Sequence, residues 1–482
     1  MTELLDFFDN ILWGSILIYL LLGTGIYFSL RTRFIQFRHF GHIFSSHWYK
    51  RNSADPRGIS TFQALCISLA ARIGTGNVAG VAFAIIAGGP GAIFWMWVIA
   101  LISMVTSLFE NTLAQLYKSR DANGRFRGGP ADYMEKGLGM RWMGVLFSLL
   151  LVISFGLIFN ALQANAIAQV AAVSFNGDPH YIAIGLVFLT AMTISGGLKR
   201  FSRLSQWMVP LMVLGYLLLA AWVIIHNIER LPQVFVLIFK SAFGLQEVAS
   251  GAIGFGVTQA LTQGVQRGLF SNEAGMGSSP NAAALAAPSP MHPAAVGFSQ
   301  MLGVFIDTMV ICSATALIIL SSGLLDVPDQ QLTGIALIQQ AVSAVTGGGL
   351  GHYLIAAFVF IFAFSSISAN YVYAENNLVF LQSGEKAKLY VFRLLVLGMV
   401  AFGCFADLPL VWKMADISMA LMTITNLTAL LLLSGVAMAV IKDYERQRRM
   451  GKTPVFNPEH FPEFRQQLTP NVWSKGPHQV KK

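Results

Sequence analysis

A short polar run interrupts an apolar stretch that is long enough to cross a bilayer. Residues 67–90 are ISLAARIGTGNVAGVAFAIIAGGP, and their centre holds Gly74, Thr75, Gly76 and Asn77. A glycine costs a helix interior about 1 kcal/mol relative to alanine, so the glycines on either side of Thr75 favour a break in the helix. In a membrane, unwound backbone survives only where it lines a protein-walled or water-filled cavity. The stretch therefore predicts a polar binding site at residues 74–77.

The two ends of such a break suit different ligands. The half-helix that follows it directs free N–H groups and the positive end of its dipole at the cavity, which favours a carboxylate. The carbonyls that end the preceding half favour a small cation. An amino acid bound together with sodium would satisfy both ends. The residues leave a second interpretation open, in which the glycines form a face for tight helix packing and Arg72 reaches toward the membrane surface.

A second stretch has the same character. Residues 248–269, VASGAIGFGVTQALTQGVQRGL, contain Gly251, Gly254 and Gly256. Two glycine-weakened spans that open the two halves of a chain are typical of inverted-repeat secondary transporters, whose binding site lies between the breaks at mid-membrane. We therefore expect the binding site to lie between residues 74–77 and 254–256.

Other apolar stretches carry polar side chains that could complete this site. They are Gln163 and Asn165, then Ser365, Ser366, Ser368, Asn370 and Glu375. Hydroxyls of Ser365 and Ser366 that face the carbonyls before the first break would supply the oxygen ligands that a hard cation such as sodium prefers. The alternative is that each serine bonds the backbone of its own helix.

Ionisable residues inside apolar stretches are expensive unless they are paired. The chain has such residues at Arg72, Glu110, Asp307 and Glu375. We expect Arg72 to form an ion pair with Asp307 or Glu110. One of these acids could also carry protons, in which case the coupling ion would be H+.

Composition identifies a polytopic membrane protein. The 482 residues are 55% hydrophobic and 11% charged, with a mean hydropathy of +0.61, whereas soluble domains carry about 25% charged residues. The net charge of +9 follows the loops, which favours membrane topology over a nucleic-acid partner. The three cysteines lie in apolar stretches and predict neither disulfides nor a thiolate metal site. No hydrolytic or redox constellation is present, and we expect neither an enzyme nor an organic cofactor.

Eleven stretches are long enough to span, because a membrane helix needs about 20 apolar residues. They lie near residues 10–30, 60–87, 91–117, 142–173, 181–197, 205–226, 249–270, 295–322, 352–381, 389–406 and 410–441. Every second boundary between them is rich in Lys and Arg, including Arg267 at the end of the seventh. The positive-inside rule then puts the N-terminus outside and the C-terminus in the cytoplasm.

This count predicts four parts. Residues 1–59 hold an extra N-terminal helix and a cytoplasmic loop, 60–247 and 248–441 are two inverted five-helix repeats, and 442–482 are a cytoplasmic tail. We expect the tail to be a solvated, partly disordered extension. The stretch 272–293, rich in small residues and proline, is expected to be an ordered cytoplasmic loop, with a re-entrant loop as the alternative.

Four blocks of residues resemble the alanine or glycine:cation symporter family, also called the sodium:alanine symporter family. They are GTGNVAG (74–80), GGPGAIFWMW (88–97), RGLFSNEAGMGS (267–278) and the FAFSSI…YAE run (362–375). The resemblance covers essentially the whole chain. It implies an all-α polytopic membrane protein with the five-plus-five inverted repeat of the leucine transporter and one extra N-terminal helix.

The resemblance also implies a set of site residues. Main-chain amides around Gly74, Thr75, Gly76 and Asn77 would hold the substrate carboxylate. The amine and side chain would be surrounded by Gln163, Gly254, Phe255, Gly256 and Asn370. The sodium ligands would be the carbonyls of Ala70 and Ile73 and the hydroxyls of Ser365 and Ser366.

One pair departs from the family pattern. Many members that carry alanine have Gly-Trp where this chain has Ala369 and Asn370, and losing the indole enlarges the pocket and adds a hydrogen-bonding group. We expect a sodium symporter that imports alanine, glycine or serine by alternating access, with glutamine or another larger neutral amino acid, or proton coupling, as alternatives. A channel and an amino-acid-sensing receptor are rival classes. We expect a monomer in the lipid bilayer of a bacterial plasma membrane.

Overall fold

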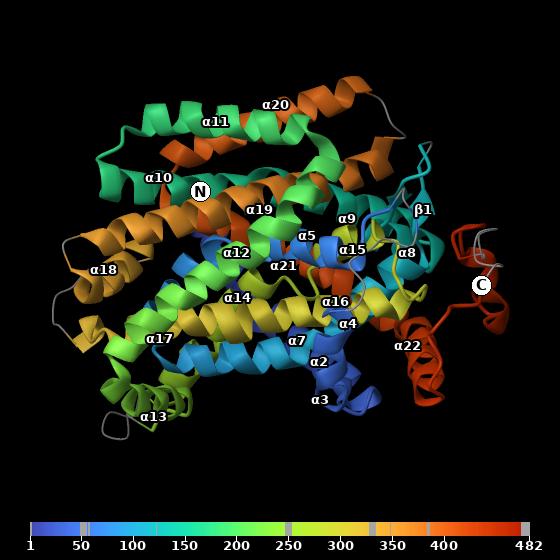
Figure 1. Ribbon diagram of the computed structural model, residues 1–482, viewed down its shortest axis with the longest axis horizontal. Coiled ribbons are helices and arrows are strands. Elements are labelled where there is room, and N and C mark those ends of the chain that lie inside the picture. The colour runs from blue at the N-terminus through green and yellow to red at the C-terminus, as the bar shows by residue number, and fades with distance from the viewer. Residues whose placement is uncertain are drawn as a thin grey trace.

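The protein is a bundle of helices that run side by side, along the horizontal direction of Figure 1. The computed structural model describes residues 2–48, 55, 58–121, 123–245, 253–326, 334–347, 349–382 and 386–473. Strand pairing in this part of the chain consists of a hairpin, in which β1 (Ser119–Arg120) runs antiparallel to β2 (Phe126–Arg127), and a single parallel bridge between Ile59 and Ala286. The predicted all-helical membrane class is confirmed.

The helices follow one another with short connections. In the first half they are α1 (Thr2–Ile11), α2 (Ile18–Arg31), α3 (Ile35–Arg38), α4 (Phe40–Trp48), α5 (Thr61–Arg72), α6 (Val81–Gly88), α7 (Gly91–Leu116), α8 (Pro130–Lys136), α9 (Arg141–Ile153), α10 (Phe159–Phe175), α11 (Pro179–Ser195), α12 (Gly197–His226) and α13 (Leu231–Ala242). In the second half they are α14 (Ile253–Asn272), α15 (Ser279–Ala284), α16 (Pro293–Val304), α17 (Ser313–Ser321), α18 (Ile335–Thr346), α19 (Leu350–Gln382), α20 (Lys386–Phe405), α21 (Leu408–Leu432) and α22 (Ser434–Arg449). Short π-helical segments join several of them, at Leu12–Leu17, Gly76–Gly80, Ser154–Ile158 and Phe305–Cys312.

Eight helical runs in the described part are long and apolar enough to cross a membrane, and a ninth is added if the bent pair Thr61–Arg72 and Gly76–Gly88 is one span. The eight are Phe7–Arg31, Gly91–Leu116, Arg141–Phe175, Gly197–His226, Pro293–Ser321, Leu350–Leu381, Lys388–Phe405 and Leu408–Leu432. α11 is a shorter apolar helix at the predicted fifth span. The protein is therefore a multi-pass membrane protein, and the number eleven stays a prediction.

Small residues bring the central helices together. α7 packs along both α14 and α16. A Cβ added at Gly264 of α14 would lie 2.5 Å from the Ala92 carbonyl oxygen of α7, and one at Gly297 of α16 would lie 2.8 Å from the Leu108 carbonyl oxygen. Such close backbone approach is the usual role of glycine between membrane helices. The three helices thus form a tightly packed centre around α7.

The second interruption lies downstream of the predicted one. α14 is helical from Ile253 through Gly254 and Gly256 to Asn272, so the break predicted at residues 254–256 is wrong. The chain instead leaves the helix at residues 273–278, where Glu273, Gly275 and Gly277 have φ of 57°, 92° and 80°. A glycine costs a helix only about 1 kcal/mol, which packing easily overrides, whereas repeated left-handed φ values require a true interruption.

The stretch expected to be an ordered loop enters the bundle, as its re-entrant alternative predicts. Residues 272–287 are buried in the bundle. They include α15, which lies against α7 and α5. The stretch of small residues therefore fits between helices instead of covering an end of the molecule.

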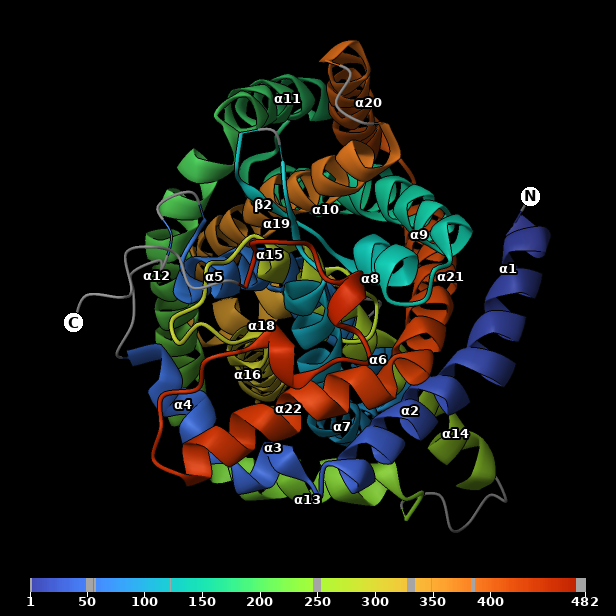
Figure 2. The same ribbon diagram turned by 90° about the vertical axis from the view of Figure 1, so that its right-hand side faces the viewer.

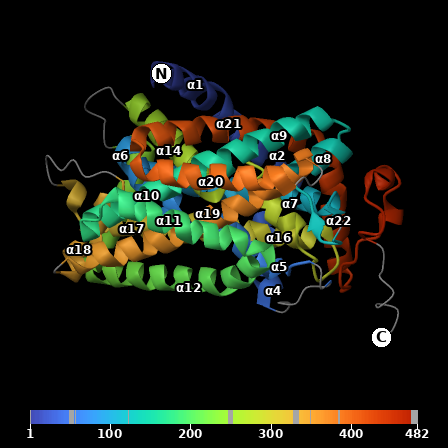
Figure 3. The same ribbon diagram turned by 90° about the horizontal axis from the view of Figure 1, so that it is seen from above.

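One end of the bundle carries the short elements. α3, α4, α8, the β1–β2 hairpin, α22 and the C-terminal segment gather at the right of Figure 1, and Figure 2 views this end directly. From above, in Figure 3, the C-terminal segment again lies at this end, beside α22.

The C-terminal segment packs its apolar side chains against the protein up to residue 473, while most of its other residues are exposed. It buries Phe456, Phe461, Phe464 and Trp473. The Trp473 indole N–H donates to the Leu116 carbonyl at 3.2 Å. The expectation of a partly disordered tail is therefore wrong for residues 452–473, because the aromatic side chains anchor them. Residues 474–482 lie outside the described part.

The Trp473 anchor gives a test. Replacing a buried aromatic side chain by alanine removes about 3 kcal/mol or more of packing, so Trp473→Ala should lower the midpoint of thermal unfolding of the detergent-purified protein. Trp142→Ala is the matched control, because Trp142 is 66% exposed. Equal midpoints for the two variants would contradict the packed tail.

Candidate functional site

The first interruption separates α5 from α6. α5 ends at Arg72, Ile73 and Gly74 leave the helix, and the π-helical segment Gly76–Gly80 starts the next half at an angle of 56°. The Asn77 side-chain oxygen accepts from the Gly74 amide at 3.0 Å. The expected break is present, and one of its free N–H groups is satisfied by a side chain of the same polar run.

Four oxygens gather beside this interruption, which we call the α5–α19 oxygen cluster: the carbonyls of Ala70 and Ile73 and the hydroxyls of Ser365 and Ser366. The Ser366 hydroxyl lies 3.0 Å from the Ala70 oxygen and 3.4 Å from the Ile73 oxygen. The Ser365 hydroxyl lies 3.4 Å from the Ala70 oxygen. All four residues are buried. The structure thus brings together every residue expected to hold sodium.

The cluster has more acceptors than protons. Both serines also lie near the Phe362 carbonyl of their own helix, at 2.8 Å from Ser365 and 3.0 Å from Ser366. Each hydroxyl supplies one proton, so two protons are shared among three carbonyl oxygens. An excess of hard oxygen atoms in a buried place suits a small cation.

Gln163 of α10 covers the free end of the second half-helix. Its side-chain oxygen accepts from the Thr75 amide at 3.0 Å and from the Thr75 hydroxyl at 2.6 Å. A Cβ at Gly74 would lie 2.5 Å from the Ser366 hydroxyl and 3.0 Å from the Gln163 amide. Gly74 therefore touches both the α5–α19 oxygen cluster and the residue that caps Thr75.

Asn370 lies one helical turn beyond Ser366 on α19. Its Nδ2 donates to Asn160 Oδ1 of α10 at 3.2 Å, and its own Oδ1 is buried with no hydrogen-bond partner among the described residues. An unsatisfied buried acceptor is costly, so a donor brought by a ligand would stabilise it. Asn370 thus adds a polar group beside α10, the helix that also carries Gln163.

Three expected site residues lie elsewhere. Gly254, Phe255 and Gly256 are in the first turn of α14. Gly256 precedes Ser271 by fifteen residues, which is about 22 Å along a helix that rises 1.5 Å per residue. The structure does not bring these three to the other site residues.

The far end of α14 takes their place beside the first interruption. A Cβ at Gly76 would lie 2.8 Å from the Phe270 ring and 3.4 Å from the Ser271 Cα. Phe270 and Ser271 were not among the residues predicted from the sequence, although both lie in the RGLFSNEAGMGS block. The signal that could have identified them is the run of glycines that follows.

The Glu110 carboxylate bonds the backbone amides of the second interruption. Glu110 Oε2 of α7 accepts from the amides of Gly275 and Gly277, each at 3.2 Å. It also accepts from Asn426 Nδ2 of α21 at 3.0 Å, and Asn426 bonds the Gly275 carbonyl at 2.9 Å. Glu110 therefore replaces the helical partners that these backbone groups lack.

Asp307 connects the two interruptions. Its carboxylate accepts from Asn77 of the first interruption at 2.7 Å and from Ser271 at the end of α14, also at 2.7 Å. A third bond, from Thr308, is 2.9 Å long. One buried carboxylate thus ties the two broken helices to the Phe305–Cys312 segment.

The expected ion pair of Arg72 with Asp307 or Glu110 is not formed. Arg72 is buried and its Nη1 donates to the Gln300 carbonyl at 3.3 Å, while Nε and Nη2 have no hydrogen-bond partner among the described residues. Arg72 still attracts both acids through space. Direct contact is unnecessary because each carboxylate already accepts several neutral hydrogen bonds.

A layer of aromatic and charged side chains lies against the Gly76–Gly80 segment on the α14 side, where a Cβ at Gly80 would lie 3.7 Å from the Trp412 ring. Arg267 forms a two-pronged ion pair with Asp416 of α21 at 3.0 and 2.9 Å. The Arg267 guanidinium lies 4.6 Å from the Trp412 ring, and Trp412 packs on Phe270 at 4.8 Å. Arg267, which was expected at the end of the seventh span, is buried in this ion pair one turn before Ser271.

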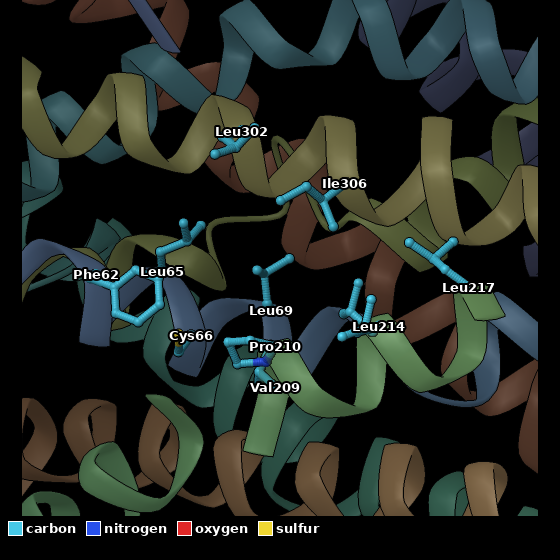
Figure 4. Close-up of a pocket in the computed structure, with 11 residues that line it drawn as sticks. Phe62, Leu65, Cys66, Leu69, Val209, Pro210, Leu214, Leu217, Leu302 and Ile306 are labelled. Atoms are coloured by element: carbon cyan, nitrogen blue, oxygen red, sulfur yellow. The ribbon is translucent and has the colours of Figure 1, made fainter. Parts of the chain in front are cut away.

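A separate groove lies on the other side of α5. Figure 4 shows its apolar walls, formed by α5, α12 and α16 and the segment after α16, with Leu69, Pro210, Leu214, Leu302 and Ile306 among the lining residues. Its lining offers no charged side chain for a zwitterion. The groove therefore lacks the charged partners that a zwitterion needs.

Comparison with known proteins agrees with this geometry. The pattern of the sodium:alanine symporter family matches residues 1–458. An uncharacterised transporter, YaaJ of Escherichia coli, is 51% identical over 98% of this chain and 99% of its own length. GlnT of Bacillus subtilis, described as a probable sodium/glutamine symporter, is 47% identical over 93% of this chain and 91% of its own. AlsT of Bacillus subtilis, described as an amino-acid carrier protein, is 46% identical over 96% of each chain. The resemblance in the four sequence blocks is thereby confirmed, and the chain belongs to the sodium:alanine symporter family, whose members are transporters and not enzymes.

Proposed function

We propose that this protein is a secondary active symporter that imports a small neutral amino acid together with sodium across the bacterial plasma membrane. The observation that carries the proposal is the α5–α19 oxygen cluster, which adjoins the interrupted helix that begins with Thr75. The cluster suits a hard cation, and the exposed end of the half-helix suits a carboxylate.

In this mechanism the amino acid displaces Gln163. Its carboxylate takes the Thr75 amide and hydroxyl, which Gln163 now occupies, and Gln163 turns its amide to the ligand. Sodium binds the carbonyls of Ala70 and Ile73 with the two serine hydroxyls. Gly74 touches Ser366 and Gln163, so the position of this one residue affects both ligands. Coupling of the two affinities must then be reciprocal.

The fold supports alternating access. We propose eleven spans arranged as an extra helix and two inverted five-helix repeats, with α5–α6 and α14–α15 as the broken first helices of the repeats. Asp307 joins the two interruptions, so they would move together. The Arg267–Asp416 pair and its aromatic neighbours then form the gate on the α14 side.

We propose an outside N-terminus and a cytoplasmic C-terminus. The end of the bundle at the right of Figure 1 holds α3, α8, β1–β2 and α22, and these elements include the basic residues Arg38, Lys136, Arg120 and Arg446. A high density of Lys and Arg marks the cytoplasmic side. We also expect the monomer to be the transporting unit.

Alanine, glycine or serine is the first choice of substrate. Glutamine is the second, and the free Oδ1 of Asn370 favours it, because the amide of a glutamine side chain would supply the missing donor. The name of GlnT, a relative 47% identical to this chain, points to the same substrate.

Transport itself can be measured in proteoliposomes. A sodium gradient at equal pH should drive saturable, uphill accumulation of labelled alanine, glycine, serine or glutamine. No accumulation under any sodium or proton gradient would contradict the proposal, and accumulation under a proton gradient alone would replace sodium by H+. Single-channel currents would indicate a channel, and binding without flux a receptor.

Ser366 tests the cation site. Ser366→Ala removes one oxygen of the α5–α19 oxygen cluster, and a bond to a charged group contributes about 1.5–3 kcal/mol. The sodium concentration that gives half-maximal uptake should therefore rise at least tenfold. Ser368→Ala is the matched control, because the Ser368 hydroxyl bonds Phe364 of its own helix. Equal sodium dependence of the two variants would remove Ser366 from the site.

Asn370 tests the substrate pocket. In Asn370→Trp the indole fills space beside Gln163, so glutamine should compete at least tenfold more weakly with alanine uptake while alanine is still carried. Asn370→Ala separates size from hydrogen bonding: it keeps the space and loses the acceptor. Unchanged competition by the full amino-acid panel in both variants would exclude Asn370 from the pocket.

A further inference from the structure

A basic groove lies between the end of α2, the short helix α3 and α22. Figure 2 shows α3 and α22 at the end of the molecule that faces the viewer. Six basic side chains and one acidic side chain line the groove: Arg31, Arg33, Arg38, Lys442, Arg446 and Arg449 with Glu445. The remaining lining residues are Thr32, Met438 and Met450. The groove lies away from the two interruptions and has no part in the proposed transport site.

Acidic partners neutralise only part of this charge. Glu445 accepts from Arg38 at 3.1 Å and from His39 at 2.7 Å. Burial would raise the pKa of Glu445, but the hydrogen bond from His39 and the charges of Arg38 and Arg449 lower it, so the carboxylate is ionised at neutral pH. Arg446 is paired with Asp443 at 2.5 Å.

Other cations of the groove have neutral partners or none. Arg31 donates to the hydroxyls of Tyr27 and Ser434 at 2.6 and 3.0 Å. Arg33 and Lys442 are exposed and have no acidic group within 4 Å in the described part of the chain. Several like charges held this close repel one another unless an anion lies between them.

The position of the groove identifies the kind of anion. Arg31 is the last residue of one apolar run, and α22 begins two residues after Leu432 ends another. The groove therefore lies where two spans leave the membrane, at the depth of lipid headgroups. Beside it, Leu30, Phe34 and Phe37 expose 60%, 46% and 55% of their surface, which provides an apolar rim next to the charged floor.

We propose that this groove binds the phosphate of an anionic phospholipid, with the acyl chains lying against Leu30, Phe34 and Phe37. Arginine and lysine together recognise phosphate oxygens by charge-assisted hydrogen bonds. Basic residues next to a membrane attract anionic headgroups, and several of them around one groove add their attractions. The bound headgroup bridges α3 and α22, which are otherwise joined through Arg38, His39 and Glu445.

Native mass spectrometry and thermal unfolding of the full-length protein test this site. In neutral detergent, added phosphatidylglycerol should raise the unfolding midpoint saturably, and one tightly held phosphatidylglycerol should survive on the protein. Phosphatidylcholine should do neither. If inorganic phosphate alone produced the same shift, the ligand would be a soluble phosphate and the lipid assignment would be overturned.

Variants that remove positive charge test whether the lipid binds in the basic groove. Arg33→Gln with Lys442→Gln and Arg446→Gln should abolish the shift and lose the one bound lipid. The matched control is Lys199→Gln with Arg200→Gln and Arg203→Gln, three exposed cations at the start of α12. Equal loss in both triple variants would mean unspecific attraction and would refute the site. If the triple variant does not fold, Arg33→Gln alone serves as the test, because Arg33 is exposed. This variant should lose part of the bound lipid, and full retention of the lipid would also refute the site.

Discussion

Peptide groups that leave a helix inside a membrane need hydrogen-bond partners, and this requirement organises the centre of the molecule. Water is scarce there, and each unsatisfied group costs several kcal/mol. Asn77 satisfies Gly74, Gln163 satisfies Thr75, and Glu110 satisfies Gly275 and Gly277. The polar side chains of the interior are thus placed by the interruptions that they support.

In the proposed mechanism the same partners make the interruptions responsive to ligands. Gln163 is exchanged for a carboxylate, and a cation outcompetes the hydroxyl protons of Ser365 and Ser366, without leaving a backbone group exposed to lipid. Glu110 and Asp307 are harder to displace, because each accepts hydrogen bonds from several elements at once. The proposed site therefore combines replaceable partners at the first interruption with two fixed carboxylates, Glu110 at the second interruption and Asp307 between the two.

The buried charged side chains differ in whether they contact an oppositely charged partner. Arg72 follows the Ala70 carbonyl of the α5–α19 oxygen cluster in sequence, but its guanidinium bonds the Gln300 carbonyl of α16 and forms no direct ion pair with Glu110 or Asp307. Arg267 and Asp416 neutralise each other directly. At the end of the bundle the basic groove has an excess of positive charge, which anionic headgroups would neutralise at the proposed membrane-facing position.

The amino-acid sequence alone determined the membrane class, the first interruption at Gly74–Asn77, the grouping of Ala70 and Ile73 with Ser365 and Ser366, and the family. These follow from local signals: apolar length, a glycine pair in a span, and short blocks of specific residues. Only the tertiary structure decided that Gly254 and Gly256 stay helical, that Phe270 and Ser271 reach the site, that Arg267 pairs with Asp416, and that Trp473 packs on Leu116. Each of these depends on a packing or ion-pair energy between residues far apart in the chain, which exceeds the cost of about 1 kcal/mol that a single glycine imposes on a helix.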